Sequence, residues 1–393
     1  MKENKIVKLS DVCDLIPGFA FKSSEFGEHK VKAVKIGDIQ PPYVNFESMT
    51  GVDISKYSVS RLAKYEIFKG DFVLAMTGAT IGKIGRYIAD TGAYINQRVL
   101  KFKPHDEVNS DFIYYVVSST SFQKYILNNV DSETAQPNIS AGSVGKYEFE
   151  LPSLEEQNRI ANILASIDNK IQLNRQINDN LEQQAQAAFN NIIAQYSESE
   201  TINLSEIAVL NPKRAIAKRT LARSIEMAQL PTSGSFPAGW DMKEYNGGMK
   251  FQNGDTLMAR ITPCLENGKV AYINFLEDNE VAFGSTEYIV IASKGAIKPE
   301  VFYFLTRYSD FVDFAVKNMN GSSGRQRVSA ETIGKYEIPL ISPEDMAVLE
   351  TIAKEALNKI KYNSLENIRL SEIRDTLLPK LMSGELEIND LDC

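Results

Sequence analysis

Residues 153–195 read SLEEQNRIANILASIDNKIQLNRQINDNLEQQAQAAFNNIIAQ, and this stretch decides how the rest of the chain is organised. Apolar residues recur along it at steps of three and four, which is the spacing of one face of an α-helix. Ser153 lies three residues before Glu156, and this capping box predicts where the helix begins. Because no proline or glycine interrupts the run, we expect one helix of about 40 residues, roughly 60 Å long. Its apolar stripe is narrow, which predicts packing along a second helix.

An internal repeat supplies that second helix near the C-terminus. Residues 145–157 (GKYEFELPSLEEQ) correspond to residues 334–346 (GKYEIPLISPEDM), and the match continues without a gap, each partner lying 189 positions downstream. Asn174 therefore corresponds to Asn363. These two residues either face water or lie in the helix seam, where a polar residue can fix register. If the helices pair antiparallel, the parts of the chain between them lie at opposite ends, related by a pseudo-twofold axis.

Length and composition indicate an ordinary globular protein. The 393 residues are enough for two to three domains, and 43% are hydrophobic and 24% charged. The N-terminus has no apolar targeting segment and no stretch approaches 18 apolar residues, so we expect a cytoplasmic protein without a membrane span. The three scattered cysteines fit a reducing compartment and argue against a zinc ribbon. The two distant histidines argue against histidine-based catalysis and histidine-rich metal sites.

The excess of acidic over basic side chains is confined to the two predicted helical segments. The formal charge is -8, but residues 153–200 carry 3 basic and 7 acidic side chains, and residues 342–393 carry 6 and 11. The remaining parts are nearly neutral and can display local basic faces. The acidic helices either serve only to keep the chain in solution, or they repel DNA or dock a protein partner.

Residues 1–152 are predicted to form a strand-rich globule. Short apolar runs in this region are bounded by glycine, aspartate, asparagine and proline, as strands of a compact domain are. The runs span residues 31–36, 71–76, 84–88 and 98–102. Residues 111–128 predict one or two helices. Their aromatic side chains either belong to the core, which is the simpler interpretation, or form platforms on which bases stack.

A second globule repeats this plan with insertions and deletions. VKLSDV at 7–12 matches INLSEI at 202–207, and KGDFVLAM at 69–76 matches NGDTLMAR at 253–260. We therefore predict an α+β fold, with two mixed α/β domains separated by two long antiparallel helices that form a coiled coil with an internal pseudo-twofold repeat. The predicted domains are residues 1–152 and 201–341, and the helical segments are residues 153–200 and 342–393.

This organisation suits a DNA target. Two recognition units on a rigid spacer can read two half-sites, and the length of the spacer fixes the distance between them. Because the two globules differ in sequence, the half-sites are expected to differ as well.

Gly-rich loops supply the first group of candidate DNA contacts. Residues 76–85 (MTGATIGKIG) resemble a phosphate cradle, but the glycine spacing is too short for a Walker A loop and no serine or threonine follows Lys83. The loop is either a plain hairpin or a turn that approaches the DNA backbone. The equivalent loop of the second globule spans residues 260–269. The candidates from these loops are Thr77, Thr80, Lys83, Arg86, Arg260 and Lys269.

The best candidate for base contacts spans residues 318–327 (NMNGSSGRQR). It combines a Gly/Ser loop with two arginines and a glutamine, and these side chains pair bidentately with guanine and adenine in the major groove. The stretch either contacts bases in this way or is a solvated loop. Residues 129–138 are the matching stretch of the first globule. The candidates are Gln136, Asn138, Ser322, Ser323, Arg325, Gln326 and Arg327. Phosphate contacts, which carry no sequence information, are assigned to Lys213, Arg214, Lys218, Arg219 and Arg223. Lys22 is a further candidate DNA contact.

Catalytic motifs give no convincing match. Residues 40–43 (QPPY) are similar to the Asn/Asp-Pro-Pro-Tyr/Phe motif of amino-methyltransferases, but glutamine replaces the expected residue and no Gly-rich S-adenosylmethionine loop precedes it. A proline-rich turn is the simpler interpretation. We expect no catalytic residue, no metal site and no cofactor in this chain.

The order and duplication of these motifs resemble the DNA-specificity subunits of type I restriction–modification systems. Each globule begins with Leu-Ser-Asp/Glu, carries a Gly-Asp strand, and ends with Gly-Lys-Tyr-Glu before a long helix. The segment at 151–164 (LPSLEEQNRIANIL) and the ending at 378–386 (LPKLMSGEL) also resemble that family. The resemblance covers almost the whole chain. It departs at residues 260–264 (RITPC), which replace the Gly-rich loop.

The resemblance implies a function and a set of partners. Each globule would be a target recognition domain that reads half of a split, asymmetric site in double-stranded DNA. The helices would set the gap and bind two methyltransferase (modification) subunits, which restriction (translocase and nuclease) subunits join. S-adenosylmethionine, ATP and magnesium would belong to those partners. A coiled-coil scaffold that binds only protein and a fused DNA methyltransferase are the alternatives.

Overall fold

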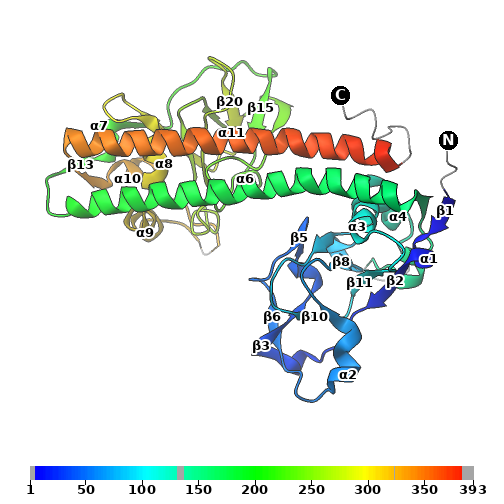
Figure 1. Ribbon diagram of the computed structural model, residues 1–393. Coiled ribbons are helices and arrows are strands. Elements are labelled where there is room, and N and C mark those ends of the chain that lie inside the picture. The colour runs from blue at the N-terminus through cyan, green and yellow to red at the C-terminus, as the bar shows by residue number, and fades with distance from the viewer. Residues whose placement is uncertain (1–4, 131–136, 323, 383–393) are drawn as a thin grey trace. The chain divides into compact units, whose positions relative to one another are not determined.

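The computed structural model describes residues 5–130, 137–322 and 324–382, and Figure 1 shows their elements. Two of the expected DNA contacts, Gln136 and Ser323, lie outside the described residues. The structure divides into two compact units. One contains the described residues up to Asn169 and those from Leu370 onward, and the other is Lys170–Arg369.

The described part of the first globule is built on three sheets. A two-stranded sheet pairs β1 (Lys5–Lys8) with β12 (Glu148–Leu151). A six-stranded sheet has the order β2 (Cys13–Pro17), β11 (Val99–Pro104), β8 (Phe72–Ala75), β9 (Ile84–Arg86), β5 (Tyr43–Val44) and β4 (Ile39–Gln40). A four-stranded sheet has the order β6 (Thr50–Val52), β3 (Phe26–Val34), β10 (Ala93–Ile95) and β7 (Glu66–Ile67). The helices are α1 (Leu9–Val12), α2 (Val59–Leu62), α3 (Ser110–Ser118), α4 (Thr120–Asn128) and α5 (Ala141–Gly145).

The second globule repeats this topology. Its two-stranded sheet pairs β13 (Thr201–Asn203) with β22 (Glu337–Pro339). Its larger sheets have the orders β14 (Ala208–Leu210), β21 (Tyr288–Ser293), β18 (Thr256–Ala259), β19 (Val270–Tyr272), and β16 (Asp241–Glu244), β15 (Leu221–Ile225), β20 (Ala282–Gly284), β17 (Met249–Phe251). The helices are α7 (Leu204–Ile207), α8 (Pro299–Thr306), α9 (Ser309–Lys317) and α10 (Ala330–Gly334). The β4–β5 hairpin of the first globule has no counterpart among these described strands.

The long helices are α6 (Leu154–Gln195) and α11 (Pro343–Met382). The Ser153 side chain accepts a hydrogen bond from the Glu156 N–H at 3.3 Å, so the predicted cap begins α6. Within the second unit the two helices run antiparallel, because Tyr196 beyond the end of α6 bonds to Asp345 at the start of α11. The predicted α+β fold, with two mixed domains, two long helices and an internal repeat, is confirmed.

Each globule packs on the two long helices in an equivalent way. In the first unit, Ile160 of α6 and Leu378 of α11 join the core of the globule. In the second unit, Leu349 of α11 and Phe189 of α6 join the core. Leu349 and Phe189 are the partners of Ile160 and Leu378 at the repeat offset of 189. Each globule is therefore anchored by the start of the helix that follows it and by the end of the other helix.

A polar layer lies in the helix seam of the second unit. Asn174 and Asn363 are only 1% and 3% exposed, so the structure excludes the alternative that they face water. Asn174 donates to Asn367 at 2.9 Å and to Glu366 at 2.7 Å. Asn363 donates to Asn178 at 2.8 Å. Asn178 and Asn367 are also partners in the repeat, so the layer consists of two matched pairs of residues. Together these pairs fix the register of the two helices.

Candidate nucleic-acid interface

In the first globule, two loops predicted separately lie against each other. The loop that follows β8 contacts the segment after residue 136 through two backbone hydrogen bonds. The Gly78 N–H donates to the Pro137 carbonyl at 3.0 Å, and the Ile139 N–H donates to the Met76 carbonyl at 3.0 Å. We call residues 76–83 and 137–139 the first loop pair.

The second globule contains the same arrangement. The Thr262 N–H donates to the Gln326 carbonyl at 3.0 Å, and the Val328 N–H donates to the Arg260 carbonyl at 3.0 Å. We call residues 260–269 and 325–328 the second loop pair. The two candidate groups of the sequence, Gly-rich turn and base-contact loop, are thus one surface in each globule.

Side chains on the first loop pair are mostly neutral. Lys83 is exposed and Asn138 is half-buried. Thr80 donates through Oγ1 to the Thr77 carbonyl at 3.2 Å. Thr77 is buried, and its Oγ1 has no hydrogen-bond partner among the described residues. Asn138 is therefore the group of this pair best placed to meet a base edge, with Lys83 as a cation beside it.

The second loop pair concentrates charge. Arg327 forms a bidentate ion pair with Glu287, with Nη2 to Oε1 at 2.7 Å and Nε to Oε2 at 2.9 Å. These hydrogen bonds lower the pKa of Glu287, and the nearby charge of Arg260 lowers it further. Arg260 is half-buried, and its Nε has no hydrogen-bond partner among the described residues. Ser322 and Arg325 are exposed and Gln326 is half-buried.

Two residues of this surface were missed from the sequence. Arg98, which is exposed, presents its carbonyl to the Met76 N–H at 2.9 Å. Glu287 presents its carbonyl to the Arg260 N–H at 3.0 Å in the same way. The two lie 189 positions apart, so the repeat offset identifies them as partners once the loops are known to meet.

Three predicted DNA contacts have structural partners instead. Arg86 bonds to Asp111 at 2.8 Å, with its guanidinium 4.0 Å from the Tyr114 ring centre. Arg214 is paired bidentately with the buried Asp255, the shortest bond being 2.6 Å. Lys269 donates to a backbone carbonyl at 2.6 Å. Since each of the three side chains is held by a partner within the fold, we leave Arg86, Arg214 and Lys269 out of the proposed interface, although Nε and Nη2 of Arg86 have no hydrogen-bond partner among the described residues.

The repeat explains why Arg86 is structural. Arg86 of β9 lies opposite Phe72 of β8 in the first globule. Tyr272 of β19 has the equivalent position beside β18 in the second globule. Tyr272 shares a hydrogen bond with Glu300, the repeat partner of Asp111, and burial is the main cause of its raised pKa. In both globules this contact therefore joins the sheet to the helix that covers it.

The remaining cations lie away from the loop pairs in sequence. Lys213, Lys218 and Arg219 are exposed on the segment between β14 and β15. Lys22 is exposed at the start of a short 3-10 turn (Ser23–Glu25) that leads into β3. These positions suit phosphate contacts, which need charge and exposure but no fixed geometry.

The QPPY sequence is a turn. Gln40 and Tyr43 face each other as the antiparallel pair that joins β4 and β5. The Pro42 carbonyl accepts a hydrogen bond from the Arg86 N–H at 2.9 Å. The motif is therefore the turn of a β-hairpin, as the simpler interpretation predicted.

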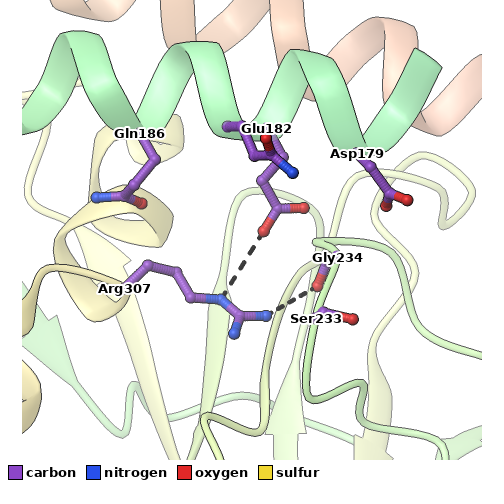
Figure 2. A pocket seen from close by; sticks show the side chains of 7 residues that line it. Asp179, Glu182, Gln186, Ser233, Gly234 and Arg307 are labelled. Carbon is purple, nitrogen blue, oxygen red and sulfur yellow. Dashed lines mark hydrogen bonds and ion pairs between the residues drawn. The ribbon is translucent and has the colours of Figure 1, made fainter. Parts of the chain in front are cut away.

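A cleft of about 430 Å³ lies in the second unit between α6 and the loop at residues 233–234 (Figure 2). Arg307 fills its base and donates to the carbonyls of Thr232, Gly268 and Gly234 at 2.8 to 3.1 Å. Its Nε lies 3.9 Å from Glu182 of α6. Burial raises the pKa of Glu182.

Glu182 and Arg307 of this cleft form an ion pair, and Arg307 also bonds to backbone. Tyr303 donates to Glu182 and accepts a hydrogen bond from Arg307. Arg307 thereby ties α6, α8 and the loop that contains Gly268, which belongs to the second loop pair. Arg307 therefore anchors that loop to the two helices.

Metal and membrane sites were also sought. Among the described residues, no group of three or more His, Cys, Asp or Glu side chains could hold a metal ion. Of the described helices, none is both long and apolar enough to span a membrane.

Known proteins similar to this chain were identified by sequence and by fold. The model of the type I restriction modification DNA specificity domain matches residues 1–183 and again residues 196–367. The chain is 23% identical to the specificity subunit of the type I restriction enzyme HindI from Haemophilus influenzae, over 82% of this chain and 88% of that protein. It is also 23% identical to the MjaIX specificity subunit from Methanocaldococcus jannaschii, over 94% and 97% of the two chains.

The fold has a counterpart of known structure. The crystal structure of the type I restriction–modification S subunit from M. genitalium aligns with a TM-score of 0.61 over 97% of both chains, at 17% sequence identity. The chain contains two copies of one domain, each with the same pair of joined loops, and its relatives align along most of their length. These observations lead to one assignment of family. The chain belongs to the family of type I restriction–modification DNA-specificity proteins.

Proposed function

We propose that each globule reads one half of a bipartite, asymmetric site in double-stranded DNA through its loop pair. The observation that carries this proposal is that both loop pairs have the same backbone hydrogen bonds but different side chains. The same scaffold thus presents Asn138 in one globule and Arg327 at the equivalent position in the other. Asparagine pairs well with adenine and arginine with guanine, so different bases would be read. The recognition domains would comprise residues 1–152 and 201–341.

Affinity would come from contacts to phosphates. The second loop pair adds Arg260 and the exposed Arg325, for which the structure describes no side-chain partner among the residues it covers. Ser322 and Gln326 can support these contacts, and Gln136 and Ser323 stay proposals in segments that are not described. The exposed cations expected to contact phosphates are Lys22, Lys83, Lys213, Lys218 and Arg219.

The helical segments, residues 153–200 and 342–393, would space the recognition domains and dock two methyltransferase subunits. Leu173 and Tyr362 support this part of the proposal, because they are 50% and 64% exposed and are partners in the internal repeat. Two matched apolar positions on otherwise acidic helices suit two copies of one partner. Restriction subunits would join this core. S-adenosylmethionine, ATP and Mg²⁺ would be bound by the partner subunits in a cytoplasmic complex.

Reconstitution with the methyltransferase subunits tests the proposal. We expect the complex to select a split DNA sequence from a random library and to methylate it, and we expect Arg325→Ala to weaken binding to all sequences. Lys335→Ala is the matched control, because it changes an exposed cation just beyond the end of α10 that forms a surface ion pair with Glu331. A complex that binds all sequences equally would contradict the proposal and favour a scaffold role.

A further inference from the structure

Three of the five N–H donors of Arg327 are fixed within the protein. The Glu287 carboxylate accepts one hydrogen bond from Nε and one from Nη2. The Arg325 carbonyl accepts one from Nη1 at 3.0 Å. A guanidinium has five donors in a planar fork, so the contacts with described residues leave one donor on each terminal nitrogen. Two donors are the number that a bidentate contact with guanine O6 and N7 requires.

Glu287 also changes the charge of the site. Hydrogen bonding to Arg327 lowers the pKa of Glu287, so the carboxylate is ionised near neutral pH. The pair as a whole carries no net charge, and the carboxylate repels a phosphate that approaches it. Arg260 and Arg325 remain beside the pair as cations. Arg327 is therefore poorly suited to general phosphate binding and well suited to a directional contact.

The side chains of the pair are partly accessible. Arg327 is 38% exposed and Glu287 is 26% exposed, so a ligand can reach the guanidinium without the pair opening. Holding a flexible side chain in its bound geometry before binding reduces the entropy lost on binding. Glu287 holds Arg327 in this way.

At the two matching positions, the first globule does not have this pair of residue types. The repeat partners of Glu287 and Arg327 are Arg98 and Asn138, a cation and an amide. The carboxylate–guanidinium pair therefore belongs to the chemistry of one half-site and is not a requirement of the shared fold.

We propose that Glu287 is a positioning residue that aims Arg327 at a guanine in the half-site read by the second globule. This inference rests on the proposed function, and it names one base and the residue that controls its selection. Glu287 itself contacts no base.

The test is a selection from a DNA library randomised in both half-sites, with the reconstituted complex. The variants are Glu287→Gln, Arg327→Ala, Arg327→Lys and the double variant Glu287→Gln/Arg327→Ala. Glu331→Gln is the control, because it removes the same charge from an exposed pair with Lys335 in the same domain. The fluorescence of Trp240, the single tryptophan of the chain, verifies that the second unit of each variant is folded.

We expect Arg327→Ala and Glu287→Gln each to reduce preference for guanine at one position, by about 5- to 100-fold, the range for a bidentate contact. Arg327→Lys should lose the same preference, because an ammonium group lacks the planar fork. The double variant should lose no more than Arg327→Ala alone, since Glu287 acts through Arg327. Glu331→Gln should behave as the wild type.

Two other results would overturn the inference in different ways. If Glu287→Gln kept the guanine preference of the wild type, or weakened binding to all sequences alike, Glu287 would not position a base contact. If the wild-type complex itself selected no bases in either half-site, the proposed function would fail, and this inference with it.

Discussion

Replacing Arg307 by methionine should destabilise the second unit strongly. Arg307 is 15% exposed and Glu182 is 16% exposed, so water screens the ion pair between them only weakly. The change leaves a buried carboxylate without its cation and three backbone carbonyls without their donor. Removing one partner of a buried ion pair costs about 3–5 kcal/mol. We expect the lower end, because the cleft beside Arg307 can admit water to the carbonyls. That is still a large fraction of the roughly 5–15 kcal/mol that stabilises a typical domain.

The single tryptophan of the chain makes the measurement local. Trp240 belongs to the second unit and stacks on Phe275 with ring centres 4.6 Å apart. Urea unfolding followed by its fluorescence therefore reports the second unit even if the whole chain does not unfold in one step. Arg307→Lys should lose about half as much as Arg307→Met, because lysine keeps the charge but not the fork. Lys335→Met, at an exposed ion pair, should change stability by at most about 0.5 kcal/mol.

The pH dependence supplies a second criterion. Burial raises the pKa of Glu182, and loss of Arg307 should raise it further. A carboxyl group whose folded pKa is raised contributes stability that is complete below its unfolded pKa, about 4.3, and is lost as pH rises through the folded value. Arg307→Met should therefore lose more stability at neutral than at acidic pH, and adding Glu182→Gln should remove this dependence. A loss below about 1 kcal/mol, or one independent of pH, would refute the anchoring role.

Three further changes test other parts of the structure. Asn174→Ala should destabilise the helix seam by about 1–3 kcal/mol, measured as faster amide exchange in α6, because Asn367 and Glu366 lose a donor. Inserting seven residues at matched points of α6 and α11 adds about 10 Å of helix and should lengthen the tolerated gap by about 3 base pairs. Methylation mapping would contradict the spacer role if the bases changed instead. The pKa of Glu287 is lowered, so its ion pair is complete above the ordinary glutamate pKa of about 4.3 and is lost only as pH falls through the lower folded value. Guanine preference should therefore be constant from about pH 5 to about pH 8, and a loss within that range, measured by selection, would exclude the pair.

Local signals in the sequence predicted most of the architecture. The apolar period of residues 153–195 is carried by contacts only three or four residues apart. It predicted the start of α6 to within one residue, whereas the helix ends at Gln195, before the end of the predicted segment at residue 200. The runs at 71–76 and 98–102 contain β8 and most of β11. Residues 111–128 form two helices, and Ser119 separates them by accepting a hydrogen bond from the Phe122 N–H. Such features depend on neighbours in sequence, which is why pattern reading finds them.

The site was harder to predict because its contacts join distant residues. Nothing local distinguishes Arg86 and Arg214, which are engaged with carboxylates, from Arg325, which is exposed. The carboxylate partners lie 25 and 41 positions away, and only the folded sheets bring them near. Glu287 was overlooked for the same reason, since it follows β20 and precedes β21 without any motif of its own.

The way the loop pairs are held accounts for both the repeat and its divergence. Four backbone hydrogen bonds join the loops, two in each globule, and backbone groups are the same whatever the side chain. The bonds impose no requirement on the residues between them, so Asn138 can stand where the second globule has Arg327. Contacts that do depend on side chains, such as Arg86 with Asp111, lie behind the loops where sheet meets helix. The fold therefore separates what must be kept, the frame and its anchors, from what can vary, the side chains that we propose contact DNA.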